Sequence, residues 1–146
     1  MSKTQLYKDL LARMTKSNAE EFYLESSWIQ YAIIEDRLNS VIRHAYPERG
    51  TELLETLRGM DRKITHITDK IHPKDQDCAT TVHKLLLKTI TKWKDRRNDL
   101  MHEIESAGSY TMLQSRTKKL ALEGVKHVND ICNRVRKYKE AVSKRS

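Results

Sequence analysis

The sequence predicts an all-α fold, an antiparallel up-and-down bundle of four long helices with a short helix at the N-terminus. Apolar residues recur every three or four positions along most of the 146 residues, which is the period of an amphipathic helix. Only four Gly and two Pro interrupt this pattern, and no stretch alternates apolar and polar residues for long enough to indicate a strand. Because the connections between segments are short, successive helices are expected to run antiparallel.

The first two helices are predicted from apolar spacing and from a capping signal. A short helix is expected over residues 4–14, with apolar positions at Leu6, Leu10, Leu11 and Met14. Ser17, with Glu20 three residues later, has the pattern of a capping box and predicts the start of a long helix that ends before Pro47. The apolar stripe of this helix comprises Leu24, Trp28, Tyr31, Leu38, Ile42 and Ala45. Trp28 is therefore expected in the core.

Two further long helices follow in the middle of the chain. Thr51 is expected to cap the third, which Pro73 ends. Its apolar positions are Leu53, Leu57, Met60, Ile64, Ile67 and Ile71. The fourth is expected to begin near Asp77 and to end before Gly108, with apolar positions at Val82, Leu86, Ile90, Trp93, Leu100 and Ile104.

The last predicted helix is the longest. Ser109 is expected to cap it, and residues 143–146 are expected to fray. Its apolar positions are Leu113, Leu120, Ala121, Val125, Val128, Ile131, Val135, Tyr138 and Val142. Because 146 residues fit one hydrophobic core, the chain is expected to form a single domain, 1–146.

Positive charge is concentrated toward the C-terminus. The formal net charge of the chain is +8. Residues 115–146 contain ten Lys and Arg against three Asp and Glu, a net charge of +7, which leaves only +1 for the remaining residues. Such asymmetry favours an anionic partner, most often nucleic acid, although a solvated helical face gives the same pattern.

The sequence also indicates the cellular compartment and argues against a metal cofactor. Cys78 and Cys132 lie far apart and lack the spacing of a metal site, so two free thiols in a reducing compartment are expected. No apolar run follows Met1, and none is long enough to span a membrane. The protein is therefore expected to be soluble and cytoplasmic, without a membrane partner.

Chemically competent side chains gather in residues 94–102, near the end of the fourth predicted helix. Arg97 occupies a position on the apolar stripe where Leu would be expected. A guanidinium there costs free energy unless it is paired or contacts water or a ligand, and Arg binds phosphate through two parallel hydrogen bonds. His102 follows five residues later and can exchange protons near neutral pH. The two residues would supply a phosphate clamp and a proton shuttle.

A resemblance to a known family rests on residues 97–102. They read Arg97-Asn98-Asp99-Leu100-Met101-His102, which resembles the R-x4-6-H motif of HEPN-domain ribonucleases, with a polar residue after the Arg. The helical layout is also similar, since the motif of that family lies late in a long helix that another helix follows. The resemblance implies an endoribonuclease without metal or other cofactor, often a toxin or defence effector with a neutralising antitoxin, whose site is shared across a homodimer.

The resemblance also assigns roles to residues. The ribose 2′-hydroxyl attacks the adjacent phosphate and leaves a 2′,3′-cyclic phosphate. His102 would move the proton, Arg97 would hold the phosphate, and Asn98 would orient the His or a phosphate oxygen. At about 100° per residue, Arg97 and His102 lie about 140° apart around a helix, so a site shared between two copies makes their spacing less awkward.

Other candidate residues have more than one interpretation. Glu35 lies on the apolar stripe of the second helix, where it would either support the site, with Asp36, or pair with Arg97 in a structural salt bridge. Tyr110 would line the cleft, pack in the core or simply be exposed. The residues expected to guide RNA are Lys118, Lys119, Lys126, Arg134, Arg136 and Lys137, with a solvated face as the alternative.

Two other classes of function fit the same sequence. A basic helical module that binds nucleic acid without cleaving it would share the charge asymmetry. A regulatory module that binds proteins would show neither salt-sensitive RNA binding nor cleavage.

Overall fold

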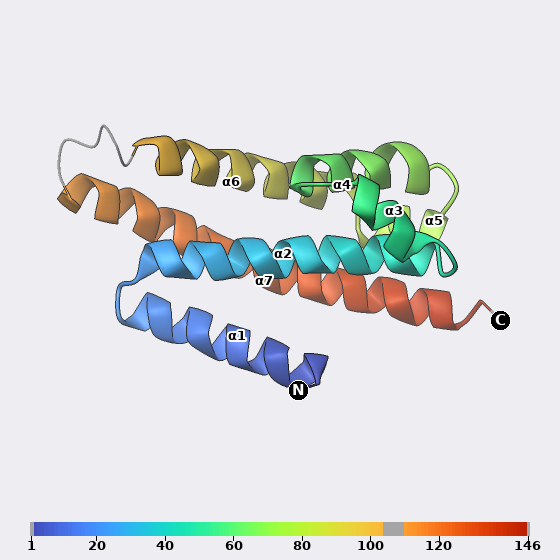
Figure 1. The fold of residues 1–146 in the computed structure, drawn as a ribbon, viewed down its shortest axis with the longest axis horizontal. Helices are drawn as coiled ribbons and strands as arrows, with labels where there is room; N and C mark the ends of the chain where they lie inside the picture. Colours follow the sequence, from blue (N-terminus) through green and yellow to red (C-terminus); the bar gives the residue numbers. More distant parts are fainter. Residues whose placement is uncertain (1, 104–109, 146) are drawn as a thin grey trace. The chain divides into compact units, whose positions relative to one another are not determined.

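The computed structural model of the protein describes residues 2–103 and 110–145, and every regular element within them is a helix. The predicted all-α fold is confirmed for this part of the chain. In chain order the helices are α1 (Lys3–Ala19), α2 (Tyr23–Ala45), α3 (Gly50–Thr56), α4 (Met60–His66), the π-helix η1 (Ile67–Ile71), α5 (Gln76–Thr81), α6 (Lys84–Glu103) and α7 (Tyr110–Ser143) (Figure 1). Among the described residues, no helix has a stretch that is long and apolar enough to cross a membrane.

Two compact units divide the chain. Unit 1 comprises Met1–Ala32 and Lys92–Lys126, and unit 2 comprises Ile33–Thr91 and His127–Ser146. The helices α2, α6 and α7 contribute residues to both units, whereas α1 belongs to unit 1 and α3, α4, η1 and α5 belong to unit 2.

The first connection lies later in the chain than the sequence predicted. Ser17 does not cap α2 but lies buried within α1, which continues to Ala19. The helix ends in a Schellman motif, because the Phe22 N–H donates to the Ser17 carbonyl (2.7 Å) and the Glu21 N–H donates to the Asn18 carbonyl (3.2 Å). Glu21 takes a positive φ of 63° there. The predicted capping box is therefore wrong, since the backbone reverses at residues that carry no Gly or Pro signal.

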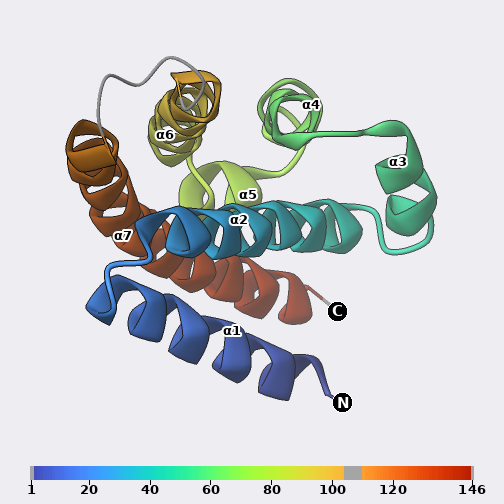
Figure 2. The same cartoon turned by 60° about the vertical axis from the view of Figure 1, so that its left-hand side comes forward.

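The predicted third helix is also wrong as a single long element. Gly59, with φ at 88°, separates α3 from α4, and the last five residues form the π-helix η1. Figure 2 shows α3 and α4 running in different directions. Thr51 lies inside α3, whose cap residue is Arg49, without a side-chain hydrogen bond. A left-handed φ is nearly free of steric cost only for glycine, so Gly59 ends a pattern that apolar spacing alone would continue.

The predicted fourth helix begins where it was expected, since α5 starts at Gln76, but it is interrupted. Asp75 caps α5 by accepting a hydrogen bond from the Cys78 N–H at 3.1 Å. The chain then leaves the helical path at Val82, whose carbonyl lies 2.9 Å from His72 Nε2, and α6 begins at Lys84. His83 Nδ1 accepts a hydrogen bond from the Leu86 N–H at 3.1 Å, which satisfies one donor at the start of α6. The predictions for Ile104, Gly108 and Ser109 fall outside the described residues.

Polar residues occupy much of the buried face of α2 in unit 1. Ser26, Ser27 and Gln30 are buried, whereas Trp28 is 60% exposed. Gln30 Nε2 donates to the Ala121 carbonyl on α7 at 2.7 Å. Trp93 is fully buried, as predicted, and its Nε1 donates to the Leu120 carbonyl at 2.9 Å. The prediction that Trp28 is a core residue is therefore wrong, because hydrogen bonding puts the polar residues of this turn inside.

The core of unit 2 is built largely from aliphatic residues of α2, α6 and α7. The buried members include Ile33, Ile34, Leu38, Ile42, Leu87, Ile90, Val128, Ile131 and Val135. At its edge, the buried Tyr138 donates its hydroxyl to Asp75 Oδ2 at 2.7 Å, and Arg145 pairs with Asp75 at 2.6 Å. The predicted fraying from residue 143 is wrong for Arg145, because these contacts connect it to the start of α5.

Candidate functional site

The candidate site in unit 1 is built around Arg97, near the C-terminal end of α6. Its side chain is half-buried, in agreement with its place on the apolar stripe. The guanidinium carbon lies 4.5 Å from the centre of the Tyr31 ring on α2. Burial lowers the pKa of the guanidinium, while Tyr31 opposes that shift. Stacking on an aromatic face partly compensates a desolvated cation, which explains how an Arg is accommodated at an apolar position.

Arg97 retains hydrogen-bonding capacity. Within the described part of the chain it has no carboxylate partner, and its buried Nε has no hydrogen-bond acceptor. Its Nη1 makes one long hydrogen bond, 3.4 Å, to Asn98 Oδ1. A charged donor in this state favours binding an anionic acceptor.

Asn98 and His102 lie one turn apart on α6, and both are exposed. The hydrogen bond from Arg97 brings Asn98 to the guanidinium. In the described residues no hydrogen bond joins His102 to Arg97 or Asn98. The structure thus groups Tyr31, Arg97 and Asn98, with His102 on the solvent side of the same helix.

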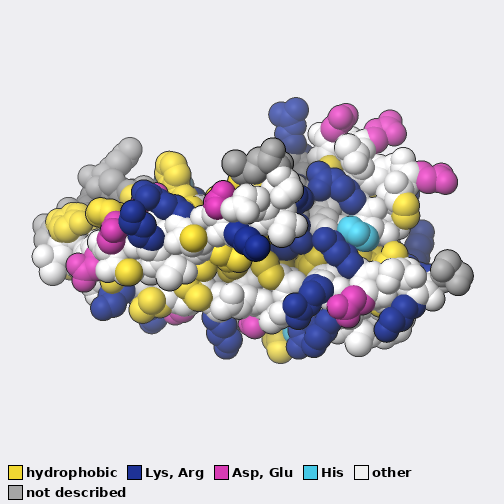
Figure 3. All heavy atoms as spheres, turned by 90° about the horizontal axis from the view of Figure 1, so that it is seen from below, with side chains coloured by type: hydrophobic (Ala, Val, Ile, Leu, Met, Phe, Trp, Pro, Cys, Tyr) yellow, Lys and Arg dark blue, Asp and Glu magenta, His cyan; other side chains and the backbone are white. Residues whose placement is uncertain are grey.

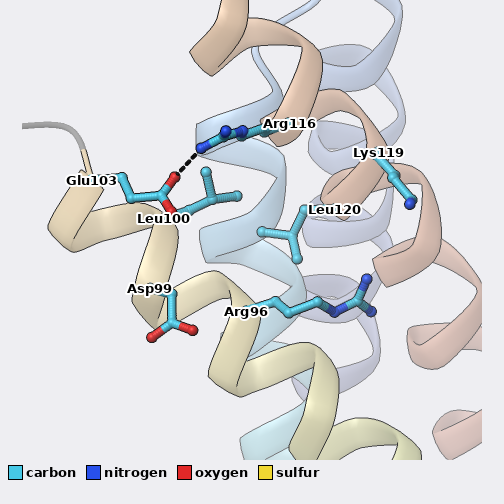
Figure 4. Close-up of a pocket in the computed structure, with 7 residues that line it drawn as sticks. All are labelled: Arg96, Asp99, Leu100, Glu103, Arg116, Lys119 and Leu120. Carbon is cyan, nitrogen blue, oxygen red and sulfur yellow. Dashed lines mark hydrogen bonds and ion pairs between the residues drawn. The ribbon is translucent and has the colours of Figure 1, made fainter. Parts of the chain in front are cut away.

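A cleft of about 340 Å³ lies beside the motif, between α6 and α7 in unit 1. Figure 4 shows Leu100 and Leu120 on its floor, with Arg96 and Lys119 projecting from opposite walls. Arg116 pairs with Glu103 at 2.6 Å across the cleft, and Arg96 pairs with Glu123. Carboxylates therefore balance much of the positive charge of this cleft.

The predicted supporting residues take different positions. Glu35 and Asp36 belong to unit 2, where Glu35 lies 3.7 Å from Lys63 Nζ and Asp36 lies 2.8 Å from Arg37 Nη2. The partner found for Glu35 is thus Lys63 rather than the suggested Arg97. Tyr110 begins α7 in unit 1 and is 76% exposed. A core position for Tyr110 is therefore excluded.

The predicted RNA-guiding residues are divided between the two units. Lys118, Lys119 and Lys126 lie in unit 1 and are exposed. In unit 2, Arg136 and Lys137 are exposed, whereas Arg134 is half-buried. In the view of Figure 3, Lys and Arg side chains are interspersed with Asp and Glu side chains.

The described residues contain no group of three or more His, Cys, Asp or Glu side chains placed to hold a metal ion. Cys78 and Cys132 are both free thiols, and burial raises the pKa of each, that of Cys78 to about 12. Neither thiol is thereby activated as a nucleophile, because the thiolate form is disfavoured.

Comparisons with known proteins add no relative. No protein-family model matches the chain, and neither the curated proteins nor the solved structures contain a significant match. The candidate site therefore rests on its own residues and geometry.

Sequence reasoning missed two features of this region. It placed Tyr31 on an apolar stripe but did not pair it with Arg97, although an Arg and a Tyr on the stripes of two helices are a recognisable signal for stacking. It also missed the exposure of Trp28. The burial of the neighbouring Ser26 and Ser27 explains this exposure, but the sequence does not show the hydrogen bonds that allow these serines to be buried.

Proposed function

We propose that the protein is an endoribonuclease that needs no metal ion and cleaves RNA by attack of the ribose 2′-hydroxyl. The observation that supports this most is the state of Arg97, a half-buried cation stacked on Tyr31 with no carboxylate partner among the described residues. Such a guanidinium favours a phosphate, which supplies both the missing charge and the missing acceptors.

In the proposed reaction the 2′-oxygen forms a bond to phosphorus while the bond to the 5′-oxygen breaks. His102, in its neutral form, accepts the proton from the 2′-hydroxyl and then delivers it to the departing 5′-oxygen. Arg97 stabilises the charge that builds on the phosphate oxygens, and Asn98 holds Arg97 or a phosphate oxygen in place. The products are a 2′,3′-cyclic phosphate and a 5′-hydroxyl.

The site is proposed to be complete only in a homodimer. Arg97 and His102 point about 140° apart around α6, so one copy does not present both side chains to one phosphate without a large swing. The guanidinium of one copy and the imidazole of the other then act on the same phosphodiester. The proposal also includes the arrangement expected from the sequence, in which the long helices of each copy pack antiparallel.

The first experiment measures cleavage of single-stranded and structured RNA in EDTA. Wild type is expected to release fragments with cyclic-phosphate ends, and His102→Ala or Arg97→Ala is expected to lose at least a hundredfold in rate. Lys92→Ala is the matched control, because it removes an exposed cation from α6 outside the motif. A substrate with a 2′-deoxy nucleotide at the cleaved position should resist cleavage.

A mixing experiment tests the shared site. In a dimer that joins Arg97 of one copy to His102 of the other, an Arg97→Ala subunit and a His102→Ala subunit together form one intact site. Random mixing should then restore up to about a quarter of wild-type activity, because half of the dimers are mixed and each has one of two sites intact. Recovery of no activity would place both residues in the same copy's site.

The second candidate is a module that binds RNA without cleaving it. The observation that favours it is the exposure of His102 without a hydrogen bond to Arg97 or Asn98 in the described residues. It predicts RNA binding in wild type and in both Ala variants, with no cleavage in any of them.

As an extension of the ribonuclease proposal, the protein acts as a toxin or defence effector that a neutralising partner holds in check. Expression of wild type in cells should then slow growth, and His102→Ala should restore it. Equal growth with both proteins would argue against this role.

A further inference from the structure

A groove lined by exposed aromatic side chains lies in unit 1, outside the residues of the proposed reaction. It encloses about 490 Å³ where the start of α2 meets the start of α7. Its aromatic residues include Phe22, Trp28 and Tyr110, which are 54%, 60% and 76% exposed. Large aromatic side chains gathered on a surface are a mark of a binding site rather than of the core.

The walls of the groove are fixed by contacts within unit 1. The Schellman motif at the end of α1 sets the position of Phe22, and Gln114 Nε2 on α7 donates to the Glu21 carbonyl at 2.9 Å. These hydrogen bonds join the turn before α2 to the first part of α7. The groove is therefore formed without any ligand and would lose little entropy on binding one.

Charge around the groove favours an anionic polymer. From Tyr110 to Leu122, α7 carries Arg116, Lys118 and Lys119 and no Asp or Glu. Glu25, a carboxylate that lines the groove, pairs with Arg13 at 2.7 Å, and the other, Glu21, is exposed to solvent. Arg116 pairs with Glu103, so Lys118 and Lys119 are the cations expected to contact the phosphates beside a base in the groove.

The groove is also next to the proposed phosphate site. Trp28 and Tyr31 lie three residues apart on α2, which places them on one face of the helix, about 4.5 Å apart along its axis. The guanidinium of Arg97 lies over the ring of Tyr31. A nucleotide whose phosphate contacts Arg97 therefore has an aromatic surface within reach of its own base or a neighbouring one.

We propose that this groove binds an unpaired nucleobase of single-stranded RNA by stacking, with Trp28 as the main platform and Phe22 and Tyr110 at its sides. The inference rests on the proposed function, which supplies RNA as the polymer. A base that is paired within a duplex cannot enter the groove. The proposal therefore specifies single-stranded segments of RNA as the substrate class.

The test uses the two tryptophans as a built-in reporter. Trp28 is 60% exposed and Trp93 is fully buried, so a base stacked in the groove should quench only Trp28. The probes are a single-stranded oligouridylate of about eight nucleotides and an abasic ribose-phosphate chain of the same length and charge. All titrations are made with the full chain carrying His102→Ala, so that binding is measured without cleavage.

The oligouridylate is expected to quench the fluorescence and to bind more tightly than the abasic chain. Trp28→Phe should remove most of the quenching, and Trp28→Ala or Phe22→Ala should weaken binding of the oligouridylate about fivefold to a hundredfold. Leu122→Ala is the matched control, because Leu122 is an exposed apolar residue of α7 outside the groove, and it should keep the affinity. Circular dichroism melts check that each variant is folded.

Two results would overturn the proposal. In the first, the abasic chain binds as tightly as the oligouridylate, or quenching persists in Trp28→Phe. In the second, the protein self-associates without RNA: the emission of Trp28 shifts to the blue as the protein concentration rises, and Trp28→Ala abolishes this self-association. A second copy of the chain would then occupy the groove. Base-dependent quenching in a protein whose wild type cleaves no RNA would support the groove while rejecting the ribonuclease, so the two proposals fail separately.

Discussion

Arg97 combines packing and proposed chemistry in a single side chain. Its aliphatic part lies where the apolar stripe of α6 continues, and its guanidinium is stacked on Tyr31. The ring compensates part of the cost of burial while leaving the donors of the guanidinium available. A Leu at this position would pack as well and bind no anion.

The role of Tyr31 is tested by changing the ring under Arg97. Tyr31→Leu should lower kcat/KM for RNA about tenfold, since a cation–π contact contributes about 0.5–2 kcal/mol and 1.4 kcal/mol is a factor of ten. Tyr31→Phe keeps the ring face and should retain most of the activity. Full activity in Tyr31→Leu would show that the ring does not position Arg97.

His66 gives a second prediction at the scale of one residue. Burial, together with Lys70 and Arg49, lowers the pKa of His66, whose Nε2 lies 3.1 Å from the Tyr46 hydroxyl. Because the folded-state pKa is lowered, folding favours the neutral imidazole. Its contribution to stability is complete above the unfolded pKa, about 6.5, and is lost as the pH falls from there toward the folded pKa.

The free energy of unfolding should therefore decrease between about pH 7.5 and pH 5.5 more steeply in wild type than in His66→Gln. Urea titrations across this range measure the two slopes. Thr65→Gln changes an exposed neighbour that does not titrate and should keep the wild-type slope. Equal slopes in wild type and His66→Gln would contradict the assignment.

At the scale of the elements, the turn that ends α1 contains a strained backbone conformation at Glu21, and a substitution can relieve this strain. Glu21 occupies the left-handed position of the Schellman motif, where glycine is usual because it lacks Cβ. Glu21→Gly should raise the free energy of unfolding by about 1 kcal/mol. Glu20→Gly, at a residue with φ of −91°, should give no such gain. A lower melting temperature for Glu21→Gly than for wild type would argue against strain at this turn.

At Gly124, α7 depends on the absence of a side chain. A Cβ there would lie 1.9 Å from Gln30 Oε1 and 3.0 Å from Trp93 Cζ2. Gln30 is fully buried and hydrogen-bonded to Ser26 and Ala121, so it cannot move without losing these bonds.

Gly124→Ala should therefore destabilise the protein by about 1 kcal/mol, and by no more than about 2 kcal/mol. Overpacking costs about 1–3 kcal/mol, and the better helix propensity of Ala returns about 1 kcal/mol. Gln30→Ala in the same chain should recover part of the packing loss, and Ser115→Ala, at an exposed position of α7, should be nearly neutral. Denaturant unfolding measures all three changes.

For the whole molecule, the net charge of +8 is less informative than its distribution. Lys118 and Lys119 are exposed on α7 and follow Thr117, which lines the aromatic groove, so phosphate contacts are expected there. Loss of each contact with a single strand should reduce the slope of log affinity against log salt by about 0.7.

Lys118→Gln with Lys119→Gln should therefore make the salt dependence of RNA binding less steep by about 1.4. The matched control is Lys8→Gln with Lys16→Gln, which removes the same charge from exposed positions of α1. Salt titrations with an oligoribonucleotide measure both slopes. Equal changes in the two double variants would show that RNA responds only to the net charge of the molecule.

Much of the fold could be predicted where local signals decide it. Apolar periodicity placed the long helices, and Pro47 and Pro73 correctly separated neighbouring segments. One error passed over a local signal, Gly59 inside the predicted third helix, and the others occurred at turns that carry no such signal. Glu21 accepts a left-handed backbone, and α6 begins after Val82 and His83, neither of which is a helix breaker. Tertiary contacts decide these places, and local propensity does not.

The sequence by itself determined the helical class, the order of most helices, the place of Trp93 in the core and the half-buried position of Arg97, because each depends on spacing along one helix. Only the tertiary structure decided which face of α2 is buried, that Tyr31 lies under Arg97 and that Trp28 faces an open groove. These features depend on which side chains from distant segments meet. Hydrogen bonds such as that from Gln30 to Ala121 can bury a polar residue and leave a tryptophan exposed.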